Sequence, residues 1–165
     1  MIISKTPFRM SFFGGGTDYP AYYKDYGGAV LSTSIDKYCY LTCRHLPPFF
    51  KHKHRLVYSK TENVNDISSI KHPAIRGVFK YLKISKGLEI HHDADLPAKS
   101  GLGSSSSFIV GMLNSIGTLY SNTYSKNELA LKAIHLEQNV LNESVGSQDQ
   151  VCLLYTSDAA DEEDS

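Results

Sequence analysis

Residues 101–107 hold two glycines and four serines, a composition that suits closing backbone N–H groups around an anion better than building a core. They follow a strand-like run and open a helix-like run. Glycine permits close approach and positive φ, and the first turn of a helix offers unpaired N–H donors at the positive end of its dipole. The segment therefore predicts a loop that binds phosphate.

Two standard nucleotide loops do not match this segment. A Walker A loop needs Gly-Lys-Ser/Thr after four spaced residues, but Gly101 is followed by no such lysine and Lys99 precedes it. A dinucleotide fingerprint needs a third glycine where Ser106 stands and an acidic residue about twenty positions on, whereas Glu128 falls on a different predicted helix. The alternative without a ligand is a serine-capped helix after a glycine turn.

A second polar group comprises Arg9 and residues 14–19, Gly-Gly-Gly-Thr-Asp-Tyr. The glycines expose backbone, and Thr17 and Asp18 offer acceptors for hydroxyl groups. Because one carboxylate accepts two hydroxyl hydrogen bonds at once, Asp18 suits a polyol. The alternative is a tight turn with an Asx cap.

A third polar group joins Glu137 with residues 146–150, Gly-Ser-Gln-Asp-Gln. Glu137 comes three residues after Ile134, which faces inwards in the predicted helix, and a carboxylate so close to an apolar face often has a partner or an ion. Taken alone, Glu137 is better explained as a surface glutamate, the commoner case. Asp149 is equally explained as a polar turn residue.

The strands that must position these groups follow from alternating apolar residues. Residues 2–13 predict a strand that ends in a glycine turn, and residues 29–45 predict two strands or one bent strand. Residues 55–59 and 87–94 are also strand-like.

The helices follow from apolar residues at helical spacing. Residues 73–83 have this spacing, with Pro73 in the first turn. Ser125 and Glu128 form a capping box that starts another helix, with Leu129, Ala133, Ile134 and Leu141 inwards. A helix that begins in the serine run has an apolar stripe of Phe108, Ile109, Met112, Leu113, Ile116 and Leu119. Strands come first and helices later, with one helix inserted, so the predicted fold class is α+β, a sheet covered by helices.

The composition indicates one globular domain with a substantial core, since 41% of the 165 residues are hydrophobic and 21% are charged. The formal net charge is zero, so we expect neither nucleic acid nor an anionic membrane as a partner. The basic residues 51–55 follow two prolines and are interpreted as a solvated loop.

Localisation is predicted as cytoplasmic. No apolar run approaches membrane-spanning length, and the N-terminus has no signal-peptide pattern. Cys39 and Cys43 fall on one face of a predicted strand, which suits buried thiols rather than a disulfide framework. A chain without such a framework fits a reducing compartment.

The last residues do not continue the pattern of the rest of the chain. Residues 152–162 resemble the translation of a sequencing-library adapter and lead into an acidic end. We expect the natural sequence to stop near Val151, with residues 152–165 as a non-native tail, which makes the chain a fragment. The alternative is a genuine acidic tail.

Together, the three polar groups resemble the N-terminal half of the GHMP kinases, the superfamily of galactokinase, homoserine kinase, mevalonate kinase and phosphomevalonate kinase. Residues 97–105, Pro-Ala-Lys-Ser-Gly-Leu-Gly-Ser-Ser, match the family's P-x-x-x-G-L-G-S-S phosphate loop. Residues 6–19 resemble the sugar-kinase signature around G-E-H-T-D-Y. Here Gly15 and Gly16 replace the Glu-His pair, which points away from galactokinase.

Three segments are similar to one branch of this superfamily, the D-glycero-D-manno-heptose 7-phosphate kinases. They are the form F-R-x-S-F-x-G-G-G-T-D within residues 8–18, residues 27–30 and residues 145–150. The motifs occur in the family's order, and the resemblance covers residues 1–151.

The resemblance implies a fold, the GHMP kinase N-terminal domain, which is similar to ribosomal protein S5 domain 2 and has a left-handed βαβ crossover. It also implies a reaction, transfer of the γ-phosphoryl of ATP to a hydroxyl of a sugar or sugar phosphate, with ATP and Mg²⁺ as cofactors. Such a transfer depends on positioning and charge neutralisation. A helix N-terminus, an arginine, and Mg²⁺ held by a hydroxyl and a carboxylate supply both.

The resemblance further implies a role for each motif residue. Asp149 is the base toward the sugar hydroxyl, Arg9 lies near the transferred phosphoryl group, and Ser105 and Glu137 hold Mg²⁺. The residues expected to bind the nucleotide are Pro97, Lys99, Ser100, Gly101, Leu102, Gly103, Ser104, Ser105 and Ser106, and those expected to bind the sugar are Gly15, Gly16, Thr17 and Asp18.

Two other functions remain open at this point. A non-catalytic nucleotide- or sugar-binding module of the same fold is the first, because the resemblance covers only the N-terminal half of the family. A nucleic-acid-binding domain like that of S5 is the second, and the neutral charge argues against it. The sequence gives no signal for an oligomeric state.

Overall fold

The two longest strands, β1 (Ile2–Phe13) and β2 (Leu31–His45), form an antiparallel pair in the computed structural model, which describes residues 1–98 and 100–155. The predicted strand over 2–13 is confirmed, and residues 29–45 contain one strand rather than two. Pro7 pairs with Tyr38 but Phe8 pairs with Ile35, so β2 carries two extra residues in a bulge. A bulge bends and twists a strand and turns the side chains beyond it.

The rest of the sheet is built on β2. Strand β5 (Leu88–Ala94) pairs antiparallel with β2 and parallel with β3 (His54–Val57), and β3 pairs antiparallel with β4 (Thr61–Val64). The order is therefore β1-β2-β5-β3-β4. The predicted strands near 55–59 and 87–94 are confirmed, whereas β4 was missed because its four residues are mostly polar.

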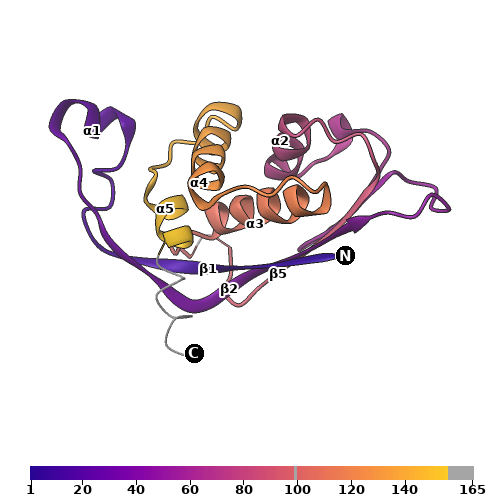
Figure 1. Cartoon of the computed structure of the whole chain (residues 1–165), viewed down its shortest axis with the longest axis horizontal. Helices are drawn as coiled ribbons and strands as arrows, with labels where there is room; N and C mark the ends of the chain where they lie inside the picture. The colour runs from indigo at the N-terminus through magenta and orange to yellow at the C-terminus, as the bar shows by residue number, and fades with distance from the viewer. Residues whose placement is uncertain (99, 156–165) are drawn as a thin grey trace.

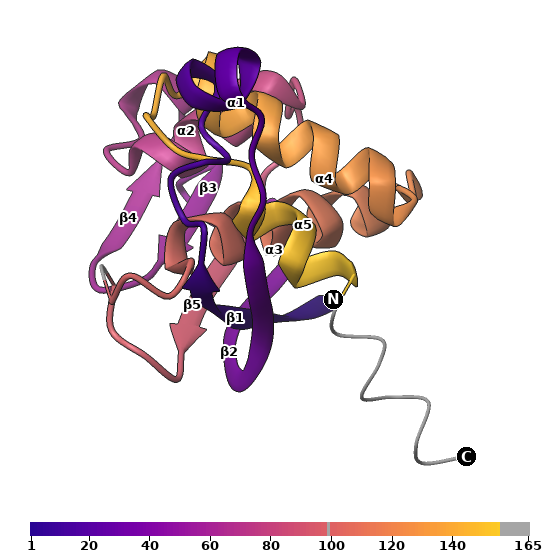
Figure 2. The same cartoon turned by 90° about the vertical axis from the view of Figure 1, so that its left-hand side faces the viewer.

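The helices gather on one face of this sheet, and the other face carries none (Figure 1). A short helix, α1, sits apart from them beyond the end of the β1–β2 pair (Figures 1 and 2). The predicted α+β class, a sheet covered by helices, is confirmed. The helical elements are α1 (Pro20–Tyr26), η1 (Ile67–Ser69), α2 (Pro73–Tyr81), α3 (Ser104–Leu119), α4 (Lys126–His135), the π-helical turn η2 (Leu136–Val140) and α5 (Gln148–Tyr155).

Helix α3 is the centre of the core, and it packs on β1 and β2. Its predicted apolar stripe is buried apart from the half-buried Leu119 at its end. The approach to the sheet is close at Gly111, where an added Cβ would lie 3.0 Å from Leu41 Cδ1 and from Thr6 Oγ1. Ser4 Oγ also donates to the Gly111 carbonyl at 3.1 Å. This packing fixes how far the N-terminus of α3 stands above β1.

Cys39 and Cys43 are buried on the helix-covered face of β2, and both are free thiols. Burial raises the pKa of each thiol to about 12. The prediction of buried thiols is confirmed.

The capping box at the start of α4 is confirmed, because Ser125 Oγ accepts from the Glu128 N–H and the Glu128 carboxylate accepts from the Ser125 N–H. Helices α1 and α5 were not predicted. Helix α5 runs on to Tyr155, past the boundary expected near Val151, and that boundary stays a prediction. Residues 156–165 of the expected tail lie outside the described residues.

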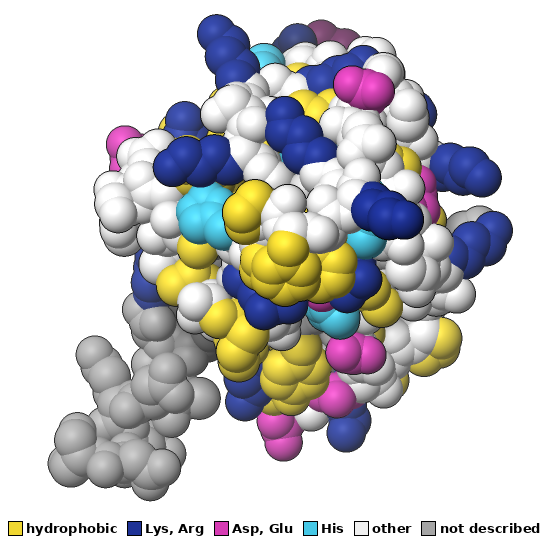
Figure 3. All heavy atoms as spheres, turned by 90° about the vertical axis from the view of Figure 1, so that its right-hand side faces the viewer, with side chains coloured by type: hydrophobic (Ala, Val, Ile, Leu, Met, Phe, Trp, Pro, Cys, Tyr) yellow, Lys and Arg dark blue, Asp and Glu magenta, His cyan; other side chains and the backbone are white. Residues whose placement is uncertain are grey.

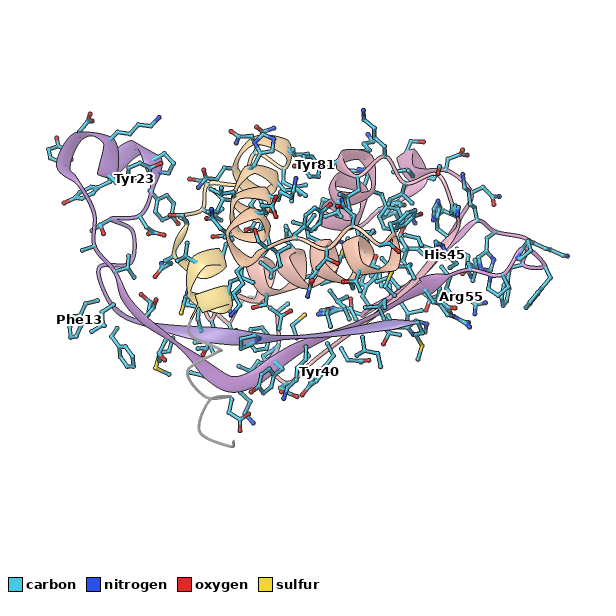
Figure 4. All side chains as sticks on the ribbon, viewed as in Figure 1. Phe13, Tyr23, Tyr40, His45, Arg55 and Tyr81 are labelled. Carbon is cyan, nitrogen blue, oxygen red and sulfur yellow. The ribbon has the colours of Figure 1, made fainter. Side chains whose placement is uncertain are left out.

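The end of the molecule that carries His45 and Arg55 (Figure 4) exposes apolar side chains beside Lys, Arg and His side chains (Figure 3). Lys51 and Lys53 are exposed, as a solvated loop requires, but His54 of the same basic segment is buried in β3. Among the described residues, no helix is both long enough and apolar enough to span a membrane.

His54 should make the fold sensitive to acid. Its Nδ1 accepts from the Leu88 N–H at 3.3 Å, and burial lowers its pKa to about 4. The unfolded chain takes up this proton near pH 6.5, so the free energy of unfolding should fall as the pH drops from about 6.5 to about 4. The variant His54→Gln keeps an acceptor but takes up no proton. Its free energy of unfolding should therefore fall less steeply with decreasing pH, by the equivalent of about one proton. Urea unfolding across this pH range measures the slope.

The matched control is His135→Gln, since His135 is exposed. We expect this variant to keep the slope of the original chain. Equal slopes for His54→Gln and the original chain would contradict the prediction.

Candidate active site

The phosphate-loop segment is tied to the two long strands. At its start, the Asp95 carboxylate accepts from the Tyr38 N–H at 2.8 Å. Further on, the Leu102 carbonyl accepts from the Arg9 N–H at 3.1 Å. Gly101 and Gly103 both have φ near +77°, a conformation that glycine adopts without strain. The loop therefore has a fixed path over β1.

Helix α3 begins directly after this loop, with Gly103 at the N-cap and no side-chain cap. The alternative of a serine-capped helix is therefore wrong. Ser107 Oγ instead lies 3.0 Å from the Gly103 carbonyl and 2.9 Å from the Pro7 carbonyl, which fastens the first turn to β1. The Ser107 N–H is the first to make a helical bond, to the Gly103 carbonyl. The N–H groups before it have no such bond, so an anion can use them.

Arg9 and Asp149 form an ion pair beside the loop, although 140 residues separate them. Arg9 Nε and Nη2 each lie 2.6 Å from Asp149 Oδ1, and Arg9 Nη1 donates to the Gly101 carbonyl at 3.0 Å. Both side chains are mostly buried, with 11% of Arg9 and 18% of Asp149 exposed. The guanidinium thus occupies one carboxylate oxygen of Asp149 and leaves the other, Oδ2, facing the loop.

Gly103 makes room for this arrangement. An added Cβ there would lie 3.2 Å from Arg9 Cγ and 3.3 Å from Asp149 Oδ2, and the positive φ would strain any other residue. The glycine is required by its conformation and by the closeness of the ion pair.

Next to Asp149, three buried side chains share hydrogen bonds. Ser106 Oγ donates to Glu137 Oε1 at 3.0 Å and lies 3.4 Å from Asp149 Oδ2. Gln150 Nε2 contacts Ser106 Oγ at 3.3 Å and donates to Glu137 Oε2. Glu137 and Gln150 have no exposed surface, and Gln150 Oε1 is buried without a partner. The cluster therefore has more acceptor atoms than donors.

Glu137 is buried, so the interpretation as a surface glutamate is wrong. Burial raises its pKa to about 7, the bonds from Gln150 and Ser106 oppose this rise, and Glu143 and Asp149 add to it by repulsion. Within residues 1–98 and 100–155, no three His, Cys, Asp or Glu side chains gather as a metal site. The acceptors available to a cation here are the two carboxylates of Glu137 and Asp149, with the Ser106 hydroxyl.

The structure separates the two middle serines of the loop. Ser105, expected to hold Mg²⁺ with Glu137, is exposed, and the hydroxyl that contacts Glu137 belongs to Ser106. Successive helical residues differ by about 100° in direction, so α3 can turn only one of the two hydroxyls toward Glu137. The role of Ser105 stays a prediction, and Ser106 is placed with the carboxylates rather than at the outside of the loop.

The other expected nucleotide-binding residues lie along the outside of the loop. Pro97, Ser100 and Gly101 are exposed, while Leu102 and Ser104 are half-buried. Lys99 lies outside the described residues.

The expected sugar-binding segment, residues 14–19, meets the start of α5. Asp18 is buried, its Oδ1 accepts from the Gly16 N–H at 3.0 Å, and its Oδ2 accepts from the Gln148 N–H at 2.9 Å. Thr17 Oγ1 lies 2.8 Å from the Gly14 carbonyl and accepts from the Ala29 N–H at 3.1 Å.

Thr17 and Asp18 therefore hold the backbone in place, as the tight-turn interpretation requires. Each Asp18 oxygen has a second lone pair, so the sugar-binding role of this segment stays a prediction. Gly15 and Gly16 are exposed, and a Cβ on Gly15 would lie 3.5 Å from Gln148 Nε2.

A mostly apolar hollow of about 240 Å³ lies on the other side of the α3 N-terminus. Two imidazole rings and a phenyl ring form its walls. The ring centroid of Phe108 is 5.2 Å from that of His72 and 4.8 Å from that of His92. Ser104 and Ser105 line the edge that faces the loop, and the remaining lining residues are Phe8, Ala74, Ala94, Leu96 and Ala98.

Residues 69–157 match the family model of the GHMP kinases N terminal domain, which is more than half of the chain. The chain belongs to the GHMP kinases. The predicted resemblance is confirmed, and the loop, the ion pair and the buried carboxylate belong to an N-terminal domain of this family.

Relatives from the GHMP kinases match almost the whole chain. This chain is 27% identical over 169 residues to the D-glycero-alpha-D-manno-heptose 7-phosphate kinase of Campylobacter jejuni. The match covers 93% of this chain and 48% of that protein. The crystal structure of a D-glycero-D-manno-heptose 1-phosphate kinase from Bacteriodes thetaiotaomicron is similar in fold, with a TM-score of 0.81, 24% identity, and coverage of 94% of this chain and 54% of that chain.

Lactococcus lactis galactokinase, crystallised with galactose, is also similar in fold. Its TM-score is 0.71 at 21% identity, with coverage of 91% of this chain and 41% of that chain. This chain therefore spans about half the length of the GHMP kinases that it matches.

Sequence reasoning assigned no role to several residues of this candidate site. Gln150 stands beside Asp149 in residues 145–150, a motif that was recognised. Its position next to a candidate base could have indicated that it belongs to the site. His72 and His92 had no sequence signal, because they come from a helix start and a strand that meet only in the fold.

The junction of residues 14–19 with α5 should tolerate no side chain at Gly146. An added Cβ there would lie 1.8 Å from Asp18 Oδ2, whereas a Cβ on Gly15 finds its nearest atom, Ser11 Oγ, at 3.4 Å. We expect Gly146→Ala to displace the Asp18 carboxylate and to lower the free energy of unfolding by about 1–3 kcal/mol. Urea unfolding measures the loss. Gly15→Ala is the matched control, and its free energy of unfolding should stay within about 0.5 kcal/mol of that of the original chain. A larger loss in Gly15→Ala than in Gly146→Ala would refute the steric argument.

Proposed function

We propose that this chain is the nucleotide-binding half of an ATP-dependent kinase that phosphorylates a hydroxyl group of a sugar or sugar phosphate. The observation that carries the proposal is the position of the Arg9–Asp149 pair and the Glu137–Ser106 pair at the mouth of the glycine–serine loop. Phosphoryl transfer requires a phosphate cradle, a neutralising charge and a base at one place, and these groups supply all three.

The cradle is the N-terminus of α3. The N–H groups of its first turn and the backbone of Gly101 and Gly103 suit the oxygens of a polyphosphate. Arg9 stands beside this turn, bonded to the Gly101 carbonyl, where its charge would stabilise a transferred phosphoryl group.

The base is Asp149, acting through Oδ2. Oδ1 is held by two guanidinium nitrogens, so Oδ2 is the atom that remains to accept a proton from a substrate hydroxyl. Helix α5 holds the carboxylate in its first turn, and the packing against Gly103 limits its movement. A fixed base next to the phosphate cradle favours transfer to a hydroxyl that lies between them.

Glu137 and the Ser106 hydroxyl beside it would hold Mg²⁺. Oxygen ligands from one or two carboxylates suit this ion, which takes its remaining ligands from water and nucleotide phosphates. When bound, it would neutralise the negative charge of the transferred group. The buried Glu137 fits this role, because a cation would offset the desolvation that raises its pKa.

The hollow lined by His72, His92 and Phe108 would hold the base of the nucleotide. It opens beside Ser104 and Ser105, next to the phosphate cradle, and its aromatic walls suit a planar ring.

The substrate that we propose is D-glycero-D-manno-heptose 7-phosphate. The support is the similarity to a kinase of that compound over 93% of this chain, together with the glycines at 15 and 16. The cradle for the sugar is residues 14–19 and the start of α5, where Gln148 Oε1 is a buried acceptor without a partner. A sugar hydroxyl that donates to this oxygen would satisfy it.

The test uses a protein in which this domain is joined to the other half found in its relatives. It is incubated with ATP, Mg²⁺ and a panel of sugars and sugar phosphates, and ADP release is measured. We expect turnover with a heptose phosphate. Nucleotide binding without turnover on any sugar would instead identify a non-catalytic module.

Asp149→Asn should remove the base and keep the shape of the site. We expect kcat to fall by about 10²–10⁴-fold, while the dissociation constant for ATP changes by less than about threefold. Rapid-quench kinetics and nucleotide titration measure the two quantities. The matched control is Asp36→Asn, on the exposed bulge of β2, which should leave both unchanged. Turnover near the original level in Asp149→Asn would overturn the assignment of the base.

A further inference from the structure

Strand β4 carries a carboxylate that is buried, although the strand itself is short and mostly polar. Glu62 is 8% exposed. Its Oε2 accepts from the Lys71 N–H at 2.7 Å, and its Oε1 accepts from the His72 N–H at 3.1 Å and from the Tyr58 hydroxyl at 2.6 Å. One side chain thus fixes the backbone on which His72 stands.

The charge of Glu62 is stabilised by these bonds. Burial alone would raise its pKa, but the bonds from Tyr58, Lys71 and His72 outweigh burial and lower the pKa. Charge-assisted bonds of this kind are stronger than neutral ones. The carboxylate is therefore a firm anchor rather than a flexible surface group.

The ring of His72 is held from three sides. Tyr58 packs edge-on against it with ring centroids 4.9 Å apart, and Phe108 lies beneath it at 5.2 Å. His72 Nδ1 accepts from the Ile75 N–H at 3.5 Å as the N-cap of α2. Because Nδ1 is an acceptor, the neutral ring carries its proton on Nε2.

Burial, with the nearby His92, lowers the pKa of His72, although Glu62 opposes the shift. The ring is thus a neutral donor at ordinary pH. It forms a wall of the hollow next to Ser104 and Ser105.

We propose that Glu62 and Tyr58 are positioning residues that hold the His72 ring as a fixed wall and hydrogen-bond donor for the nucleotide base. The inference rests on the proposed function, since it needs the nucleotide to lie in this hollow. The ligand class is a nucleobase with a ring-nitrogen acceptor, which His72 Nε2–H can reach only if the ring does not rotate. Glu62 limits that rotation indirectly, because it bonds the His72 backbone and the hydroxyl of Tyr58, whose ring packs edge-on against the imidazole.

The test compares two ligands of the full chain by calorimetric titration, ATP and inorganic tripolyphosphate. Tripolyphosphate has the phosphates but no base, so it reports on the loop alone. His72→Asn removes the ring but keeps a good helix N-cap. Glu62→Gln removes the charge that strengthens the bonds to Tyr58 and to the Lys71 and His72 N–H groups. Tyr58→Phe is a milder variant that keeps the packing and loses only the hydroxyl.

We expect the dissociation constant for ATP to rise about tenfold in His72→Asn and about fivefold in Glu62→Gln, as the loss of base stacking and of one hydrogen bond implies. Tyr58→Phe should give a smaller rise in the same direction. Tripolyphosphate binding should stay within about twofold in all three. The matched control is Glu128→Gln, which weakens the exposed cap of α4 and should change neither ligand.

Three outcomes would overturn the inference. If ATP binding is unchanged in His72→Asn and Glu62→Gln, the ring does not contact the base. If ATP and tripolyphosphate weaken together, Glu62 only supports the fold. If the original chain binds neither ligand, the proposed nucleotide site itself fails, and this inference fails with it.

Discussion

The ion pair between Arg9 and Asp149 is the contact on which the candidate site depends. It joins β1 to α5, and through the Gly101 carbonyl it also holds the phosphate loop. A mostly buried ion pair is weak evidence for stability, because desolvation of both groups offsets their attraction. Its value here is geometric, since one arginine sets both the path of the loop and the orientation of the Asp149 carboxylate. Gly103 suits the same contact, because an added Cβ would crowd Arg9 and Asp149 and the positive φ would strain any other residue.

The N-terminus of α3 stands between two polar networks that make opposite demands. On one side, Glu137, Ser106 and Asp149 form an acceptor-rich cluster suited to a cation. On the other side, the network around Glu62 holds an uncharged aromatic hollow. A nucleotide has both characters, a charged chain and a flat apolar base. The fold thus places two unlike environments on either side of one helix start.

The motifs and the main elements could be predicted from the sequence because they depend on local pattern, such as the alternation in β1 and the stripe of α3. Which of Ser105 and Ser106 contacts Glu137 could not be predicted, because it depends on the rotation of α3 as the helix packs on the sheet at Gly111. Glu137 lies in the π-helical turn η2, where it and Leu136 are both fully buried. Single π turns are common at functional sites and leave little trace in sequence periodicity.

The balance of donors and acceptors explains why this cluster suits a cation. Arg9 is the cation of the group, and it is already engaged by Asp149 Oδ1 and the Gly101 carbonyl. The remaining acceptors are Glu137, Asp149 Oδ2 and the buried Gln150 Oε1, and the cluster's own donors do not satisfy all of them. Buried acceptors in excess are costly in a core. A bound metal ion with its polyphosphate would satisfy these acceptors, so the unsatisfied groups lie at the place where a ligand would bind.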